Sequence, residues 1–308
     1  MLKSLVRRNI KLFFKDKGSF LTAMITPLIL LLLYSTFLGK IYRDSFASSL
    51  PAGVTVSDAL LDGTVGGQLV ASLLAVSCVT VSFCVNLIMI QDKTTGAIRD
   101  LLMAPVKKTT LALAYYLATL ASSLIISMVT FSVGLIYLAF TGWYLTVGDI
   151  LLVILDIFLL CMFATALSSI ICHPLSTQGA ASAVGTLVSA CYGFLCGAYM
   201  PISSFGEGLQ KVLSCLPGTY GTALLKNHLM QGSFEEMRNI GFPGEVVDGI
   251  RRSIDLTPEF FGHTVTVGEM YAIMAGTVLI LVAVYVLMQK LSRRASGAKA
   301  ARRGGRKQ

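Results

Sequence analysis

Long runs of apolar residues recur six times along the chain. They lie at residues 20–38, 69–90, 109–140, 150–172, 179–200 and 270–289. An α-helix needs roughly 20 apolar residues to cross the hydrocarbon core of a bilayer, and the six runs have about that length or more. The run at 109–140 is longer, so we expect it to tilt or to project beyond the bilayer. The pattern predicts an all-α integral membrane protein with six transmembrane helices, forming a single domain over residues 1–308.

In residues 1–18, before the first apolar run, apolar and basic residues recur with the period of an α-helix. Leu2, Leu5, Val6, Ile10 and Phe13 fall on one face, and the other face is basic. An amphipathic helix with a basic face typically lies in the membrane interface. We therefore predict an N-terminal interface helix. The alternative is a simple cluster of charges that stops translocation.

Composition and charge placement agree with a membrane protein. The chain is 55% hydrophobic and 13% charged, whereas a soluble domain carries about 25% charged residues. A soluble enzyme and a disulfide-rich secreted scaffold are thereby excluded. The net charge of +9 does not indicate nucleic acid, because 18 of the 25 Lys and Arg lie in the N-terminal segment, in residues 91–108 and after residue 289. The positive-inside rule places these segments, and so both termini, in the cytoplasm of a multi-pass cell-membrane protein.

Residues 91–108 connect the second and third predicted spans and contain a short amphipathic helix. It runs from about Thr94 to Met103 and is closed by Pro105. Ile98, Leu101 and Leu102 form one apolar ridge. An exposed ridge of this kind indicates a docking surface for a partner protein. The alternative is that the ridge lies on lipid or on the neighbouring spans.

Residues 201–268 precede the last predicted span and are too polar to cross the bilayer again. We predict two short helices within residues 201–230, broken at Pro217-Gly218, that re-enter the outer face of the membrane. Irregular backbone at that depth is tolerated only where it packs against protein or faces water. Residues 231–268 are predicted to form a long outer loop with a short helix near residues 246–254. Residues 291–308 form a basic tail that we expect to be disordered.

A few polar side chains interrupt the predicted spans. Asp156 is the only ionisable residue within them, and such a residue is a candidate functional site. It would contact a substrate or carry a proton; alternatively, water or a partner helix satisfies it, because it lies about two turns from the end of its span. Asn86, Ser189 and Tyr192 are candidates for lining a central pathway, although polar and small residues also pack helices together.

Two motifs resemble those of the ABC-2 type exporter permeases. The first lies in the cytoplasmic connection and comprises Gly96, Leu101, Leu102, Pro105, Lys107 and Lys108. Gln91-Asp92 stands near the place where that family usually has a glutamate. The second follows the fifth span and comprises Gly197, Pro201, Leu216, Pro217 and Tyr220, with Phe205-Gly206 where a second proline is common. The motifs occur in the family's order, and the resemblance covers nearly the whole chain.

The resemblance implies a transport subunit without an ATPase site of its own. The sequence agrees, because it contains no Gly-x-x-x-x-Gly-Lys-Ser/Thr phosphate-binding loop. A separate cytoplasmic ABC ATPase subunit would bind ATP and Mg, and a second permease subunit, identical or related, would complete the path. The residues expected to couple to the ATPase are Gly96, Ile98, Arg99, Leu101, Leu102 and Pro105.

The predicted function is therefore ATP-driven efflux of a hydrophobic or amphipathic cargo such as a drug, an antimicrobial peptide or a lipid, in a membrane that is expected to be bacterial. An ion- or proton-coupled secondary transporter centred on Asp156 is the alternative. A membrane enzyme is disfavoured, because acids and histidines are scattered: His173, His228 and His263 are expected to be ordinary loop residues. We predict no cofactor in this chain, no metal site and no nucleic-acid partner.

Overall fold

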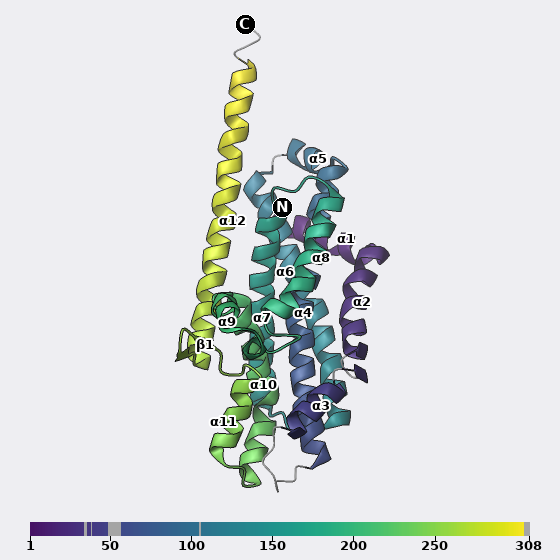
Figure 1. The fold of residues 1–308 in the computed structure, drawn as a ribbon. Helices are drawn as coiled ribbons and strands as arrows, with labels where there is room; N and C mark the ends of the chain where they lie inside the picture. Colours follow the sequence, from purple (N-terminus) through teal and green to yellow (C-terminus); the bar gives the residue numbers. More distant parts are fainter. Residues whose placement is uncertain (34–35, 38, 49–56, 105, 305–308) are drawn as a thin grey trace.

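A computed structural model describes residues 1–33, 36–37, 39–48, 57–104 and 106–304. The described chain is almost entirely helical (Figure 1). Its elements are α1 (Leu2–Lys15), α2 (Lys17–Leu33), α3 (Gly39–Ser48), α4 (Asp58–Thr94), α5 (Ala97–Met103), α6 (Lys108–Thr141), α7 (Val147–Cys172), α8 (Gln178–Leu195), the 3-10 turn η2 (Ile202–Ser204), α9 (Glu207–Leu213), α10 (Pro217–Asn239), α11 (Gly244–Ser253), β1 (Glu259–Phe260), β2 (His263–Thr264) and α12 (Val267–Gly304). The two short strands pair antiparallel.

Helix α4 is the centre of the bundle. It packs against α2, α6, α7, α8 and α10, and 89% of its most apolar stretch is buried, against 22% for α12. α12 therefore lies at the periphery, as Figure 1 shows. The same view places α5 at one end of the bundle and α3 and α11 at the other; we call these the α5 end and the α11 end. A second, smaller core at the α11 end joins the start of α4 to α10 and α11.

Four of the described helices are long and apolar enough to cross a membrane: α4, α6, α7 and residues 267–291 of α12. The number becomes five if α1 and α2, which meet at 74°, count as one broken span. The predicted spans at 20–38 and 179–200 correspond to α2 and α8, which have only 17 and 18 residues. Residues 34, 35 and 38 lie outside the described part. A multi-pass, all-helical membrane protein is thus confirmed, and six spans stay a prediction.

The second span begins earlier than the apolar run indicates. Residues 39–68 were predicted to form a connection, but α3 and the first eleven residues of α4 lie there. Ser57 caps α4, because its side chain accepts a hydrogen bond from the Leu60 amide, and Asp58 complements the helix dipole in the first turn. A good cap and a buried apolar face extend the helix beyond the part that hydropathy alone detects.

Two further predictions about the C-terminal third are wrong in part. The break before Pro217 occurs as expected, but α10 is not short: it continues for 23 residues to Asn239, into the predicted loop 231–268. Pro217 occupies its first turn, where a missing amide hydrogen costs nothing. The predicted helix near 246–254 corresponds to α11. The tail expected to be disordered continues α12 as a helix to Gly304, since Ala, Lys and Arg are good helix formers.

Candidate functional site

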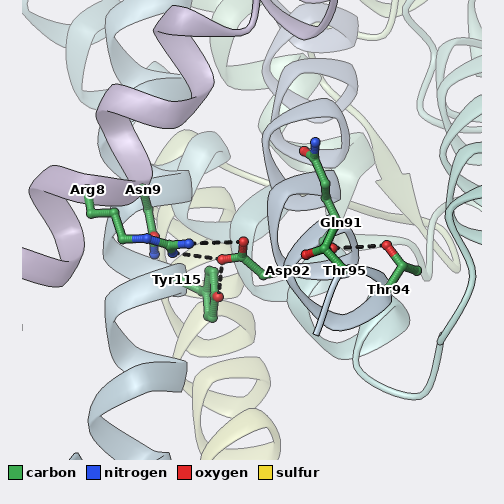
Figure 2. A network of polar contacts seen from close by, with 7 residues as sticks. All are labelled: Arg8, Asn9, Gln91, Asp92, Thr94, Thr95 and Tyr115. Carbon is green, nitrogen blue, oxygen red and sulfur yellow. Dashed lines mark hydrogen bonds and ion pairs between the residues drawn. The ribbon is translucent and has the colours of Figure 1, made fainter. Parts of the chain in front are cut away.

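A partly buried ion pair ties helix α1 to the bundle at the α5 end (Figure 2). Arg8 of α1 donates to Asp92 of α4 through both terminal nitrogens, with Nη1–Oδ2 at 2.7 Å and Nη2–Oδ1 at 3.1 Å. The hydroxyl of Tyr115 on α6 donates to the same carboxylate at 2.5 Å. A two-point guanidinium–carboxylate contact is strong and directional. Three helices are thus locked together by one carboxylate, whose side chain is 9% exposed.

The contact with Asp92 favours the charged form of Arg8. The hydrogen bond to Asp92 raises the pKa of Arg8 above its usual value, and its attraction to the carboxylate adds to this, while burial opposes both. Arg8 Nη1 also donates to the Asn9 side chain at 2.9 Å. The acidic residue that stands near the family's glutamate position therefore holds α1 against α4.

The next residue, Lys93, joins the end of α4 to the end of α7. Its Nζ donates to the carbonyls of Cys172, His173 and Leu175 at 3.4, 2.8 and 3.1 Å. The last carbonyls of a helix have few partners within it, so a lysine at a helix C-terminus supplies hydrogen bonds to them. The hydroxyl groups of two threonines that follow Lys93 donate to the Gln91 carbonyl and close α4, as Figure 2 shows.

Helix α5 is connected to this end of α4 by Gly96. The glycine has φ +83°, a conformation that costs little without a side chain. The apolar ridge of Ile98, Leu101 and Leu102 is half-buried and packs against the main core. Ile98 and Leu102 line a cavity of 190 Å³ between α5 and the bundle, which Lys93 also lines. The ridge thus lies on the neighbouring helices, the alternative left open by the sequence.

The residues of α5 that face solvent are Arg99, Asp100 and Met103. Arg99 and Asp100 are exposed, and Met103 is 87% exposed. We call these three residues the outer face of α5. Pro105 lies outside the described residues. A partner that binds the outer face of α5 would therefore contact two charges and one methionine. The two leucines face the other way and pack α5 against the bundle.

A largely apolar groove of 370 Å³ runs between α2, α4 and α8. Its wall includes Leu30 of α2, Phe83 of α4 and Gly185 of α8. Ser189 also lines it, but its hydroxyl donates to the Gly185 carbonyl of its own helix at 2.8 Å. The Thr80 hydroxyl is buried in the wall without a hydrogen-bond partner among the described residues. Of the four pathway candidates, only Ser189 lines this groove.

Asn86 and Tyr192 lie elsewhere. The Asn86 amide donates to the hydroxyls of Ser168 and Ser169 at 3.2 and 3.4 Å, joining α4 to α7. The Tyr192 hydroxyl donates to the Gly218 carbonyl at 3.3 Å. Tyr192 lines a separate, almost wholly apolar cavity of 430 Å³ between α7, α8, the start of α10 and α12. The structure therefore does not bring the candidates into one pathway.

Asp156 has two protein partners. His228 Nδ1 lies 2.6 Å from Asp156 Oδ2, and the Tyr271 hydroxyl donates to Oδ1 at 2.6 Å. The carboxylate belongs to a residue only 2% exposed and joins α7 to α10 and α12. The expectation that His228 is a loop residue is wrong: it lies buried within α10. The structure therefore agrees with the alternative in which neighbouring helices supply the hydrogen bonds of Asp156.

The second motif forms the turn between α8 and α10. Gly197 has φ +70°, and its carbonyl accepts from the buried Lys226 Nζ at 2.7 Å. Pro201 precedes the 3-10 turn η2. Pro217 starts α10, and the Tyr220 hydroxyl donates to the Ser214 carbonyl at 2.6 Å. These four of the motif's five residues thus shape and fasten the segment between α8 and α10.

Two buried ionisable residues, Lys226 and Asp255, fasten the same segment through hydrogen bonds to backbone groups. Lys226 Nζ donates a second hydrogen bond to the Ile254 carbonyl at 3.1 Å. The nearby Asp255 accepts from the amides of Ile202 and Ser203. Burial lowers the pKa of Lys226, and the attraction of Asp255 partly opposes that shift. The lysine thus joins α10 to the segment after α8 and to the end of α11 through two backbone carbonyls.

Several of these residues were missed in the sequence. Arg8 is one of many basic residues in α1, and nothing local distinguishes it from Arg7. For Tyr115 and Tyr271 the sequence did offer an indication of a hydrogen bond, because a tyrosine hydroxyl within an apolar helix usually has a partner. Among the residues described here, no group of three His, Cys, Asp or Glu could hold a metal ion.

The chain also matches a known protein family. A model of the ABC-2 type transporter family matches residues 1–229. The match includes the ion pair at the α5 end, α5 itself, the α2–α4–α8 groove and the turn after α8. A comparison with curated proteins finds no match.

Proposed function

The chain belongs to the ABC-2 type transporter family, and we propose that it forms the translocation path for a hydrophobic or amphipathic cargo, driven by a separate ATPase subunit that docks on α5. One observation carries the proposal. α5 is a short helix that presents an exposed face while its own ridge packs against the bundle, and Lys93 and the Arg8–Asp92 pair fasten the adjoining end of α4 to α7 and α1. The family implies the permease role, and the geometry supports this site of coupling.

The connections indicate how a push on α5 would reach the groove. α5 continues from α4 through Gly96, and α4 is the central helix. The Arg8–Asp92 pair and Lys93 make the end of α4 move together with α1 and α7. Because α4 forms one wall of the α2–α4–α8 groove, a displacement of α4 changes the width of that groove. ATP and Mg would be bound by the partner subunit, not by this chain.

The groove supports an apolar or amphipathic cargo. Apolar side chains form most of its wall, so removal of apolar cargo surface from water would be favourable there. A second permease subunit of the same or a related kind would complete the path. We place the α5 end and both termini in the cytoplasm of the cell membrane, on the distribution of basic residues.

A proton-coupled carrier centred on Asp156 is not favoured. Both carboxylate oxygens already have hydrogen-bond partners within the chain. Asp156 does not line the α2–α4–α8 groove. A carrier site needs access to cargo or to water, and a residue that is 2% exposed has neither in this conformation.

The test changes the charge of the outer face of α5. Met103→Asp places a charge where an apolar contact is proposed, and Arg99→Glu reverses a charge; each should weaken ATPase binding roughly tenfold or more, as expected for a central contact residue. Both side chains are exposed, so the permease should stay folded. Ser176→Asp, on the exposed connection between α7 and α8, is the matched control.

The measurement is co-purification of the ATPase with each variant, together with cargo efflux. We expect loss of both for Met103→Asp and wild-type behaviour for Ser176→Asp. If both α5 variants retain the ATPase and support efflux, the docking site is wrong.

A further inference from the structure

A polar cavity of 430 Å³ lies beside α11. Figure 1 places α11 and α5 at opposite ends of the bundle. The cavity is bounded by α10, α11 and the segment around the β1–β2 hairpin. Its lining residues are Gln231, Arg238, Asp248, Arg251, Arg252, Thr257 and Thr264. None of them lines the α2–α4–α8 groove.

The cavity carries an excess of positive charge. Arg238 pairs with Asp248 at 3.2 Å, which offsets one of the three guanidinium groups. Arg252 has no ion pair or side-chain hydrogen bond within the described part of the chain, and it is exposed. The position of Arg251 and Arg252 in the last turn of α11 accounts for part of the pattern, since cations stabilise that end of a helix. Arg238 lies likewise in the last turn of its own helix, α10, so basic residues from the ends of two different helices meet at this cavity.

Arg251 is held in place from one side. Its Nη2 donates to the Asn227 side chain at 3.0 Å, and its guanidinium lies 5.6 Å from the centre of the Phe234 ring. Burial lowers the pKa of Arg251, and repulsion by Arg238 lowers it further, while Asp248 opposes these effects. A fixed guanidinium beside a second positive charge is a prepared contact for an anion.

A second polar cavity of 270 Å³ adjoins the first and shares Arg252 and Thr257 with it. Hydroxyl and amide side chains from the α9 region line it, and so do the carboxylates of Asp255 and Glu259. The Thr257 hydroxyl, in the shared wall, is buried and has no hydrogen-bond partner among the described residues. Carboxylates and hydroxyls suit a ligand that donates hydrogen bonds, such as a polyol, and the arginines suit an anion.

We propose that the joined cavities bind a phosphorylated polyol, with its phosphate between Arg251 and Arg252, its hydroxyl groups on the side of Glu259, and Thr257 as a further contact. The same chemistry occurs in the headgroup of phosphatidylglycerol and in soluble glycerol phosphate. The site does not depend on ATPase docking, so it is tested on the purified full-length chain without nucleotide.

The experiment measures binding of glycerol 1-phosphate by calorimetry, with glycerol as the uncharged comparison. A parallel arm compares lipid retention in bilayers of phosphatidylglycerol and of phosphatidylcholine. We expect saturable binding of the phosphorylated probe and none of glycerol. Binding of the soluble probe alone identifies a soluble ligand, and a preference for phosphatidylglycerol identifies a lipid headgroup; either supports the site.

Three variants sharpen the test. Arg252→Gln removes an exposed, unpaired cation, so it should keep the fold and weaken binding about tenfold, as for one charge-assisted hydrogen bond. Thr257→Val should also weaken binding, but without lowering the melting temperature, because its hydroxyl has no partner to lose. Lys211→Gln removes an exposed cation of α9 outside both cavities and should bind as the wild type does. Undiminished binding by Arg252→Gln, an equal loss in Lys211→Gln, or no saturable binding of either probe overturns the proposal.

Discussion

The ion pair between Arg8 and Asp92 makes a quantitative prediction about stability. Arg8→Met keeps a long apolar side chain but removes both hydrogen bonds to Asp92, leaving that carboxylate with Tyr115 alone. Removal of one partner of a fully buried pair costs about 3–5 kcal/mol. The Arg8 side chain is 31% exposed, and solvent screens such a contact, so we expect a smaller loss of about 2 kcal/mol.

Substitution of the other partner, Asp92, should lower the free energy of unfolding by less. Asp92→Asn removes the negative charge, but Arg8 can turn toward water, so we expect a loss of about 1 kcal/mol. The double variant should lose less than the two single losses combined, because each single change already breaks the same contact. This asymmetry between the partners follows from their unequal exposure.

The assay is thermal unfolding of the detergent-purified permease, read as an apparent melting temperature because unfolding of such proteins is commonly irreversible. A loss of about 2 kcal/mol corresponds to a fall of roughly 4 °C for a chain of this size. Arg7→Met is the matched control, since Arg7 is the exposed neighbour of Arg8 in the same helix. Equal melting temperatures for Arg8→Met and Arg7→Met, or full additivity in the double variant, would falsify the structural role of the pair.

Three further predictions concern other parts of the molecule. Gly232→Ala should strongly destabilise the chain, because a Cβ there would lie 1.7 Å from the Tyr144 carbonyl oxygen, whereas Gly249→Ala, with nothing within 4 Å, should stabilise α11 by about 0.5–1 kcal/mol; equal melting temperatures would contradict the packing. Asp156→Asn should retain efflux and abundance, while Asp156→Leu should lower abundance by leaving the buried His228 and the half-buried Tyr271 hydroxyl without this partner; loss of efflux at normal abundance in the Asn variant would restore a transport role for the acid. In a Cys215→Ser background, which removes the exposed native thiol, an impermeant thiol reagent should label intact cells carrying Glu245→Cys but not Ser176→Cys; the opposite pattern would invert the topology.

The sequence determined those features that depend on local order. Apolar runs predicted α6 and α7 within a few residues of their ends, because hydropathy and span length are properties of consecutive residues. The 3.6-residue period predicted α1, and the ridge with its following proline predicted α5. Both motifs could be recognised from consecutive residues, and they indicated the family whose model matches the chain.

Only the tertiary structure decided which polar groups meet. Asp92 and Arg8 are 84 residues apart, and Asp156 and His228 are 72 apart. No local pattern specifies such a pair, because it depends on which helices pack against α4 and α7 and with what rotation. For the same reason the sequence could show that α5 has an apolar ridge but not that the ridge faces its own bundle. An amphipathic pattern requires an apolar neighbour without naming it, and here the rest of the chain provides that neighbour.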